Sequence, residues 1–296
     1  MLLILILLFS QSVSAHVTSS ASEWHELLEH KMAVDRIEHL TDGQLEVIIN
    51  EEWAHIRSQC PQIPEIPSMH ASFDSTLVNT YTLAWASQTL VLGSDLLWIP
   101  ALLSGTTTSG YHFVIGVNPS PPNGWYSGTT CTDIGYRYDL RTVLRHELLH
   151  GLALASSVTV TSNIWSLGHT FLGICYPRRY DTKITDSDGN SIIGLTGCVV
   201  GDLTGKELYI NDVPLYNPLV FNQGSSISHH NHDGHLMYYA TRARTCMDLG
   251  EFEAKMLSEL GVTCTVGGET YDSGSYLTPS LIVLSLPILS VLLLIM

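Results

Sequence analysis

The chain has 296 residues, of which 45% are hydrophobic and 14% are charged, and its formal net charge is −15 at pH 7. This acidic balance argues against nucleic acid and anionic membrane surfaces as partners, because both would repel it. About 255 residues lie between two strongly apolar ends, which is enough for one large domain or two small lobes.

Residues 1–15 predict a secretory signal peptide. An apolar run from Met1 to Phe9 ends at the small residues Val13-Ser14-Ala15, and cleavage is expected after Ala15. The usual Lys or Arg before such a run is missing. Export would place the mature chain in an oxidising, extracellular compartment.

Residues 16–68 predict a helical N-terminal segment. Two helices are expected between about Ser20 and Ser58, with a break at Asp42-Gly43, and three prolines then form a stiff linker. The apolar positions at helical spacing are Leu27, Leu28, Met32, Ile37 and Leu40. The sequence leaves open whether this segment is a propeptide or a flank of the domain that follows.

A strand is predicted after an apolar stretch that runs from Thr80 to Leu103. Its residues are Tyr111, His112, Phe113, Val114, Ile115, Gly116 and Val117. The residues at 118–124 are Asn, Pro, Ser and Gly, which form turns and end the strand.

The most informative motif is His146-Glu147-Leu148-Leu149-His150, an HExxH pattern. On a helix, the two histidines share one face and can bind one metal ion, and Glu147 lies beside its open position as a general base. Asp139 is the expected N-cap. The apolar residues of this helix are Leu140, Val143, Leu144, Leu148, Leu149 and Leu152. Such a helix is buried, so its histidines need partners, and hydrogen-bonded core histidines are the alternative to a metal.

The strand Tyr111–Val117 precedes this helix, as the substrate-binding edge strand does in zinc peptidases. We expect it to bind a peptide by pairing with it as a further strand. An ordinary strand inside a sheet is the alternative.

Beyond the helix, a β-hairpin is predicted from Tyr180–Thr185 and Ser191–Leu195, around Asp186-Ser187-Asp188-Gly189-Asn190. These carboxylates resemble the opening of a calcium loop, but the later ligands and terminal Glu are missing, so Ca²⁺ is only a weak alternative. A last helix is expected over Glu251–Leu260, with Gly261 as its C-cap.

Six cysteines in an exported chain predict three disulfides. Short loops favour Cys175–Cys198 and Cys246–Cys264, which leaves Cys60 with Cys131, although six cysteines allow fifteen connectivities. A competing interpretation makes Cys60 a propeptide thiolate that blocks the metal.

A third metal ligand must come from elsewhere, because catalytic zinc takes three protein ligands and keeps one position open. The metzincin pattern HExxHxxGxxH would need Gly and His where this chain has Ala153 and Ser156. The next histidine-rich region contains His229, His230, His232 and His235.

With these residues the chain resembles leishmanolysin-like zinc metallopeptidases, relatives of the metzincins in which a long insertion separates HExxH from a later Ser-His and a methionine turn. It is also similar to bacterial secreted proteins that carry HExxHGLGF. The resemblance covers roughly Tyr111 to Thr263 through Trp125-Tyr126, His146–Leu152, Ser228-His229 and Leu236-Met237.

The resemblance implies an α+β, zincin/metzincin-like domain with an active-site helix and a mixed sheet. It implies one Zn²⁺ on His146, His150 and His229, Glu147 as general base, and Met237 as the apolar floor below the metal. His230, His232 and His235 are alternative third ligands. Tyr239, two residues after Met237, is either an aid to the oxyanion, as in astacin- and serralysin-like enzymes, or a packing aromatic.

The C-terminal residues 281–296 are hydrophobic and end without a basic stop. They are short for a membrane span, which needs about 20 residues. Upstream, residues 265–280 contain Ser273-Gly274-Ser275, so a GPI-attachment signal is predicted, with Ser273 or a residue nearer Gly268 as attachment site. A retained single-span anchor is the alternative.

The sequence therefore predicts a zinc metallopeptidase domain over residues 69–264. It would be exposed at the cell surface, held to the outer membrane leaflet by a lipid anchor, and would act on proteins or peptides. The alternative functions are a non-catalytic surface adhesin and a metal-binding protein on the same scaffold. Nothing in the sequence indicates the oligomeric state.

Overall fold

The computed structural model describes residues 40–65, 68–93, 95–105, 111–162, 164–171, 174–193 and 199–272. The predicted signal peptide, the attachment residue Ser273 and the hydrophobic segment 281–296 lie outside the described residues. The described helices include none long and apolar enough to cross a membrane.

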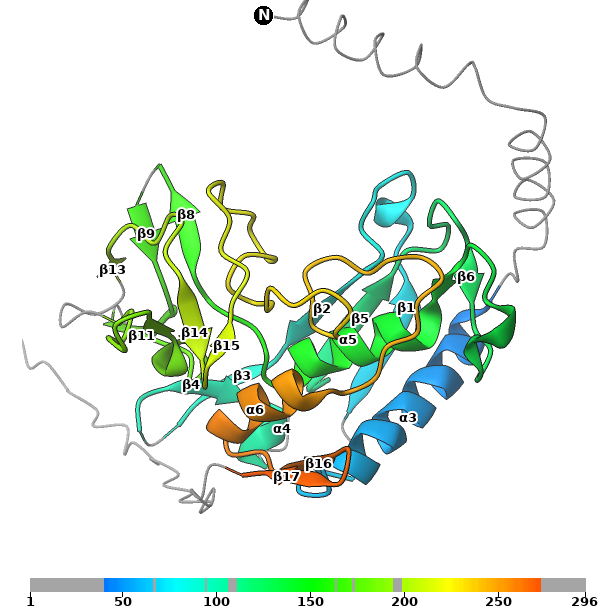
Figure 1. The fold of residues 1–296 in the computed structure, drawn as a ribbon, viewed down its shortest axis with the longest axis horizontal. Coiled ribbons are helices and arrows are strands. Elements are labelled where there is room, and N and C mark those ends of the chain that lie inside the picture. The colour runs from blue at the N-terminus through cyan, green and yellow to red at the C-terminus, as the bar shows by residue number, and fades with distance from the viewer. Residues whose placement is uncertain are drawn as a thin grey trace, which may run out of the picture.

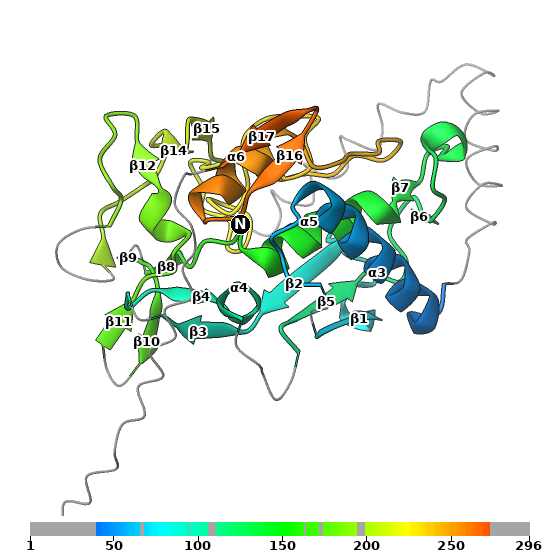
Figure 2. The same cartoon turned by 90° about the horizontal axis from the view of Figure 1, so that it is seen from below.

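The fold is mixed α and β, with several small sheets (Figures 1 and 2). The first part of the chain forms α3 (Asp42–Gln59), β1 (Met69–Phe73), β2 (Ala84–Gln88), β3 (Leu90–Leu92), β4 (Trp98–Pro100), α4 (Ala101–Ser104), β5 (Phe113–Val117), β6 (Trp125–Tyr126), β7 (Tyr138–Asp139) and α5 (Leu140–Leu152). The second part forms β8 (Thr159–Thr161), β9 (Ile164–Ser166), β10 (His169–Phe171), β11 (Ile174–Tyr176), β12 (Thr185–Asp186), β13 (Val199–Val200), β14 (Leu208–Ile210), β15 (Val213–Pro214), α6 (Glu251–Glu259), β16 (Cys264–Val266) and β17 (Glu269–Tyr271).

The two parts lie side by side. In both views α3, α5 and the sheet of β1, β2 and β5 are at one end of the molecule, and the short strands β8 to β15 are at the other (Figures 1 and 2). Buried apolar side chains from Leu45 in α3 to Cys264 in β16 form one continuous core. The chain is therefore one packed body across these elements.

Helix α3 begins where the sequence predicted a break between helices. Thr41 caps it: its hydroxyl accepts from the N–H of Gln44, whose side chain in turn accepts from the N–H of Thr41. Leu45, Ile49 and Ile56 are fully or almost fully buried on the face toward α5. The predicted 16–68 segment thus contains a helix that is packed into the same core as the HExxH helix.

The sheet next to α5 corrects the predicted edge strand. β5 lies in the middle of the order β1-β5-β2, parallel to β1 and antiparallel to β2. The prediction that Tyr111–Val117 is an edge strand is wrong, because two strands from earlier in the chain occupy both of its sides. The edge position beside α5 belongs to β2.

Helix α5 can approach this sheet closely because it carries Gly151. A Cβ atom there would meet the Phe113 ring of β5 at 2.8 Å, closer than side chains tolerate. Phe113 is itself 1% exposed, so it has no room to move aside. The glycine after the second histidine therefore fixes the distance between helix and sheet.

The predicted hairpin around Gly189 is reduced to a single bridge between Thr185 and Ser191, and β12 pairs with β14 instead. Gly189 has φ +79° and permits the tight turn. The Asp186 carboxylate accepts hydrogen bonds from the backbone N–H groups of Asp188 and Asn190. The backbone closes the same turn with bonds from the N–H of Asp186 to the Asn190 carbonyl and from the N–H of Gly189 to the Asp186 carbonyl, and no group of metal-binding residues is found there among the described residues.

Two predicted disulfides are wrong. Cys60 is bonded to Cys264 and Cys131 to Cys246, across sequence separations of 204 and 115 residues. Cys60 follows the last turn of α3 and Cys264 begins β16, and packing of these elements in the core brings the pair together. Cys175 is also in a disulfide, and its predicted partner Cys198 lies outside the described residues.

Candidate metal centre

Helix α5 places two imidazoles on one side. Asp139 caps the helix by accepting from the N–H of Thr142 at 3.0 Å, as expected. Four residues separate His146 from His150, so the rings lie one turn apart with centroids 4.8 Å from each other. Both rings point away from the apolar face of the helix that packs into the core.

The helix ends without the glycine of the metzincin pattern. Ala153 is the C-cap at φ −173°, an extended conformation that any residue adopts. The N–H groups of Ala153 and Leu154 both bond the Leu149 carbonyl, at 3.0 and 2.9 Å. This turn brings the Leu154 carbonyl back to His150, where it accepts from Nδ1 at 2.5 Å.

The third imidazole comes from His229, 79 residues after His150. Its Nε2 lies 3.0 Å from Nε2 of His146 and 3.1 Å from Nε2 of His150. The preceding Ser228 hydroxyl accepts from the N–H of Ser156, which ties this loop to the segment leaving α5. Ser156 stands at the position of the metzincin histidine, so here that segment supports the third imidazole instead of supplying it.

All three rings are oriented by backbone carbonyls. Nδ1 of His146 donates to the carbonyl of Leu236 at 2.7 Å, and Nδ1 of His229 donates to the carbonyl of Ser225 at 2.7 Å. His150 is held in the same way by Leu154. A carbonyl can only accept, so each Nδ1 carries the proton and each neutral ring turns an unprotonated Nε2 toward the same point.

Burial keeps the three rings neutral. It lowers the pKa of His146, lowers that of His150 to about 3, and lowers that of His229 well below its ordinary value. The neighbouring imidazoles act in the same direction for His150 and His229, since two positive rings would repel. Three neutral, converging lone pairs form a ready-made site for a cation.

The donor set fits zinc. His146, His150 and His229 form the one group of three or more His, Cys, Asp or Glu residues, within the described part of the chain, that could hold a metal ion. Imidazole nitrogen is a preferred ligand of Zn²⁺, whereas Ca²⁺ takes oxygen. Tetrahedral bonds of about 2.0–2.1 Å place the nitrogens about 3.3 Å apart. The separations of 3.0 and 3.1 Å from His229 to the other two rings are close to that value, and the ligand atoms of the three residues all lie within 4.8 Å of one another.

The other histidines of the region have different partners. His230 is completely buried, and its Nε2 donates to the Glu253 carboxylate at 2.8 Å. His232 stacks on the Phe252 ring with centroids 4.0 Å apart, and His235 packs on the same ring at 4.6 Å. None of the three points its ring toward the centre formed by His146, His150 and His229.

Met237, the expected apolar floor of the metal site, is completely buried. Its N–H donates to Glu253 at 2.9 Å and its carbonyl accepts from the N–H of His230 at 3.1 Å. Burial alone would raise the pKa of Glu253, but the hydrogen bonds and charge of His230 outweigh it and lower the pKa. The ionised Glu253 thus anchors the turn that presents the Leu236 carbonyl to His146.

Glu147 lies in the cleft with the three histidines and is 6% exposed. Burial raises its pKa to about 8. A cation bound by the adjacent imidazoles would lower that value, because an opposite charge favours the carboxylate. The pKa of the Glu147 carboxyl therefore lies near neutral pH, and it would fall when a metal ion binds to the histidines.

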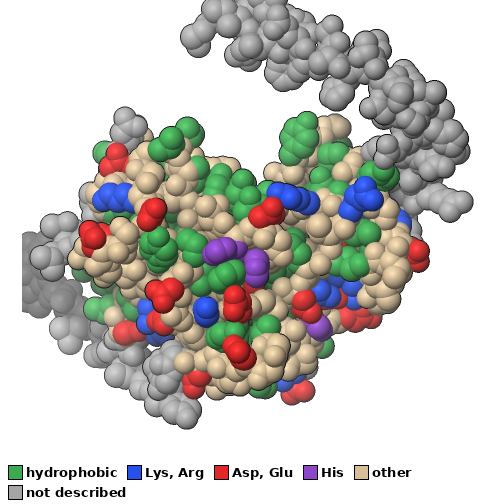
Figure 3. Space-filling model, in the orientation of Figure 1, with side chains coloured by type: hydrophobic (Ala, Val, Ile, Leu, Met, Phe, Trp, Pro, Cys, Tyr) green, Lys and Arg blue, Asp and Glu red, His purple; other side chains and the backbone are tan. Residues whose placement is uncertain are grey.

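The cleft around the histidines has a volume of about 710 Å³. Figure 3 shows one face of the molecule, with histidine side chains near its middle and acidic and basic side chains around them. One wall is β2, from Ala84 to Gln88, and the opposite wall includes residues 222–225 and 239–241. Tyr239 lines this second wall, 39% exposed, and stacks on Tyr216 with ring centroids 3.8 Å apart.

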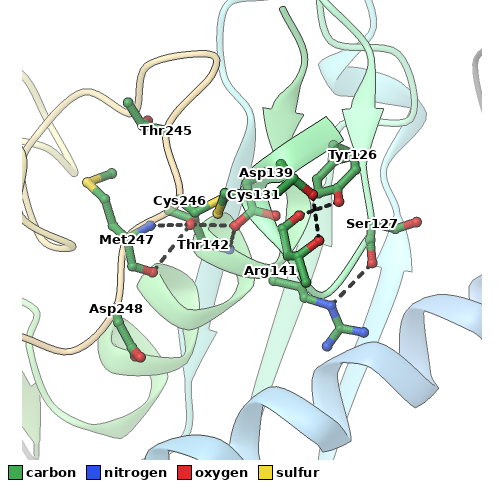
Figure 4. Close-up of a disulfide and its surroundings, with 12 residues drawn as sticks. Tyr126, Ser127, Cys131, Asp139, Arg141, Thr142, Thr245, Cys246, Met247 and Asp248 are labelled. Carbon is green, nitrogen blue, oxygen red and sulfur yellow. Dashed lines mark hydrogen bonds between the residues drawn. A yellow bond between two sulfur atoms is a disulfide. The ribbon is translucent and has the colours of Figure 1, made fainter. Parts of the chain in front are cut away.

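A disulfide secures the chain that continues from this second wall. Cys131–Cys246 joins the turn before α5 to the segment after the methionine turn (Figure 4). Beside it, the hydroxyl of Thr142 in α5 accepts from the N–H of Met247 at 2.7 Å. The wall is thus fixed to the first turn of the helix that carries His146.

Several residues that shape this site carry no local signal in the sequence. The carbonyls of Leu236, Leu154 and Ser225 act through the backbone, which any residue could supply. Glu253 and the strand β2 act through their place in the fold. A buried glutamate three residues into a helix is an N-terminal capping signal, and only its contact with His230 reveals a second role.

Comparison with protein-family models, with curated protein sequences and with solved structures finds no match for this chain. The interpretation of the centre therefore depends on its own geometry.

Proposed function

We propose that this protein is a zinc-dependent metalloendopeptidase. The observation that carries the proposal is the convergence of three unprotonated Nε2 atoms beside the buried carboxyl of Glu147, in an open cleft. A structural zinc site is normally closed by a fourth protein ligand, whereas a catalytic site keeps a position open. Here three ligands and an acid–base residue face the cleft together.

Each residue has a role in peptide hydrolysis. The chemistry that zinc supplies in such a site is polarisation of the scissile carbonyl and a lowered pKa for a coordinated water. Glu147 accepts the proton of that water and passes it to the leaving amine. The Tyr239 hydroxyl, on the cleft wall, donates to the oxygen on which negative charge develops.

The strand β2 is the proposed binding edge for the substrate. Among the described strands it pairs only with β5, so its other edge faces the cleft that contains the histidines. An extended peptide can pair with such an edge through main-chain hydrogen bonds, which hold it straight without requiring a particular sequence. The role that the sequence assigned to Tyr111–Val117 therefore passes to Ala84–Gln88.

The test is a comparison of the zinc-loaded wild-type protein with Glu147→Gln on a peptide library. The variant is expected to bind one zinc per chain and to unfold at the same denaturant concentration as wild type, since Glu147 is not a ligand. Its hydrolysis rate should fall by about 100-fold or more, because general-base catalysis is lost. Equal rates in the two proteins, or no hydrolysis by either, would contradict the proposal; the second result would favour an adhesin or a metal-binding protein.

The proposed setting is the cell surface, reached through the secretory pathway. The disulfides of Cys60–Cys264 and Cys131–Cys246 are typical of that pathway. The proposed GPI anchor is tested by treating cells with phosphatidylinositol-specific phospholipase C, which should release the protein. Recovery of a peptide from residues 284–292 in the mature protein would show a retained anchor instead.

A further inference from the structure

A single, partly buried cation lies at one end of the cleft. Of the described residues that line the cleft, Arg178 is the one Lys or Arg, and Glu147 is the one Asp or Glu. The chain as a whole carries a net charge of −15, so a positive group in this place is not explained by composition. Long cationic side chains normally keep their charged end in water.

The fold holds Arg178 firmly in this place. Its backbone forms a bridge with Trp98 in β4, where the Trp98 N–H donates to the Pro177 carbonyl and the Trp98 carbonyl accepts from the Arg179 N–H, both at 2.9 Å. Its guanidinium donates to the carbonyl of Ala155, in the segment that leaves α5. Ala155 and Gln88, the last residue of β2, line the same end of the cleft.

Asp181 is a carboxylate whose charge acts on Arg178. Burial lowers the pKa of Arg178, and Asp181 opposes that shift. The Asp181 carboxylate is completely buried, and it already accepts from the hydroxyls of Ser156 and Ser157. Burial also raises the pKa of Asp181. Among the described residues that line the cleft, Arg178 is thus the one Lys or Arg side chain that a substrate carboxylate could meet.

We propose that Arg178 binds a carboxylate of the substrate and makes the enzyme selective for acidic peptides. The proposal rests on the proposed peptidase function and names its substrate class. Guanidinium and carboxylate form paired, charge-assisted hydrogen bonds, which are stronger and more directional than neutral ones. A peptide paired antiparallel with β2 places its N-terminal portion at the Gln88 end, so an Asp or Glu side chain before the scissile bond is the expected ligand.

The experiment measures kcat/KM for peptides that differ only by Glu or Gln, placed in turn at each position on both sides of the cleaved bond. A second pair, with a free or an amidated C-terminus, distinguishes a side-chain carboxylate from a terminal one. The wild-type protein should prefer one carboxylate-bearing peptide by about 10- to 100-fold, the usual value of a hydrogen bond to a charged group. In Arg178→Gln this ratio should fall to about one.

Arg179→Gln is the matched control. Arg179 is the adjacent cation, but it pairs with Asp95 and does not line the cleft, so its removal should leave the preference unchanged. Arg178→Glu should reverse the preference toward peptides with Lys in the same position. Zinc content and the denaturation midpoint show whether each variant is folded.

Binding measured without turnover separates this proposal from the proposed function. Fluorescence anisotropy of the labelled peptides is recorded on Glu147→Gln and on Glu147→Gln with Arg178→Gln. Tighter binding of the carboxylate peptide that is lost with Arg178 supports the proposal even if no peptide is cleaved. An equal affinity for Glu and Gln peptides, or a preference that survives in Arg178→Gln, would overturn it.

Discussion

At the scale of single residues, this centre separates two adjacent histidines into different roles. His229 turns its Nε2 toward His146 and His150, whereas His230 turns the other way and donates to the buried Glu253. The two adjacent side chains thus point to different partners, so the histidine pair gives one candidate ligand and one anchor. The two roles predict different losses on substitution.

Replacement of His229 by Ala should abolish tight zinc binding while the domain stays folded. The loss in affinity should exceed the roughly 10- to 100-fold typical of residues that only orient a ligand. Replacement of His230 by Ala should instead cost about 3–5 kcal/mol of folding free energy, because the buried Glu253 carboxylate loses its imidazole partner and keeps its bonds to the N–H groups of Met237 and Gly250. Zinc titration and denaturant unfolding of both variants check this, and a reversed pattern would make His230 the ligand.

The lowered pKa values of the three ligands predict acid sensitivity of the metal-free protein. The pKa of each ring is lower in the folded protein than the value near 6.5 in the unfolded chain. Below about pH 6.5 the unfolded chain therefore binds more protons, and the free energy of unfolding decreases as the pH is lowered. Each imidazole contributes up to about 1.4 kcal/mol per pH unit. The carboxyl of Glu147 acts oppositely: its folded pKa is raised to about 8, so its contribution falls as pH rises above 4.5.

Glu147→Gln removes that opposing group. Urea unfolding of the metal-free variant from pH 7.5 to 5 should give a steep loss of stability, and additional replacement of His150 by Asn should reduce the slope by up to about one proton. A slope that is flat, or that is unaffected by removal of His150, would show that these rings are protonated in the folded protein.

At the scale of secondary-structure elements, the HExxH helix is positioned from two sides. β2 and β5 lie on one side, Gly151 sets the approach to β5, and α3 packs on another face. Between α3 and α5, Glu52 is 2% exposed and accepts from both Arg141 and Arg145. These arginines are one turn apart on α5, so one carboxylate fixes the rotation of the helix.

This ion network predicts a large difference between two adjacent glutamates. Glu52→Gln should lower the free energy of unfolding by about 3–5 kcal/mol, since it leaves two arginines short of a buried counter-charge. Glu51 also binds Arg141, but its side chain is 54% exposed. Glu51→Gln should therefore lower the free energy of unfolding by at most about 1 kcal/mol. Similar denaturation midpoints for the two variants would show that the network does not hold α3 to α5.

At the scale of the whole molecule, covalent links join regions far apart in the sequence. Cys60–Cys264 connects the end of α3 with β16, and Cys131–Cys246 connects the approach to α5 with the segment after the methionine turn. The loop closed by Cys60–Cys264 contains all the residues that line the cleft, and the loop closed by Cys131–Cys246 contains the three histidines and Glu147. If α3 were cut away as part of a propeptide, this first link would still hold it to the domain.

Digestion of the unreduced protein should therefore yield linked peptides that contain Cys60 with Cys264 and Cys131 with Cys246. Replacement of both Cys60 and Cys264 by Ser should lower stability by about 5 kcal/mol in the chain-entropy view, because the closed loop is 204 residues long. Mass spectrometry identifies the pairs. A peptide that links Cys60 to Cys131 would restore the prediction made from loop lengths.

The sequence by itself determined the local parts of this centre. The HExxH spacing, the Asp139 cap and the final helix over residues 251–259 follow from backbone geometry within a few residues, where contacts are fixed by the helical repeat. The Ser228-His229 pair was found by resemblance, and the structure brings that histidine to the other two.

Only the tertiary structure decided which distant segments meet. The alternation of Tyr111–Val117 indicates a strand but holds no information on its neighbours, and β1 and β2 enclose it as β5. Cysteine spacing favours short loops, yet packing of the core brought Cys60 to Cys264. Arg178 is an unremarkable basic residue in the sequence and a partly buried cation that lines the cleft in the structure. Local patterns record the preferences of the backbone, whereas neighbours across the chain are chosen by the packing of the whole core.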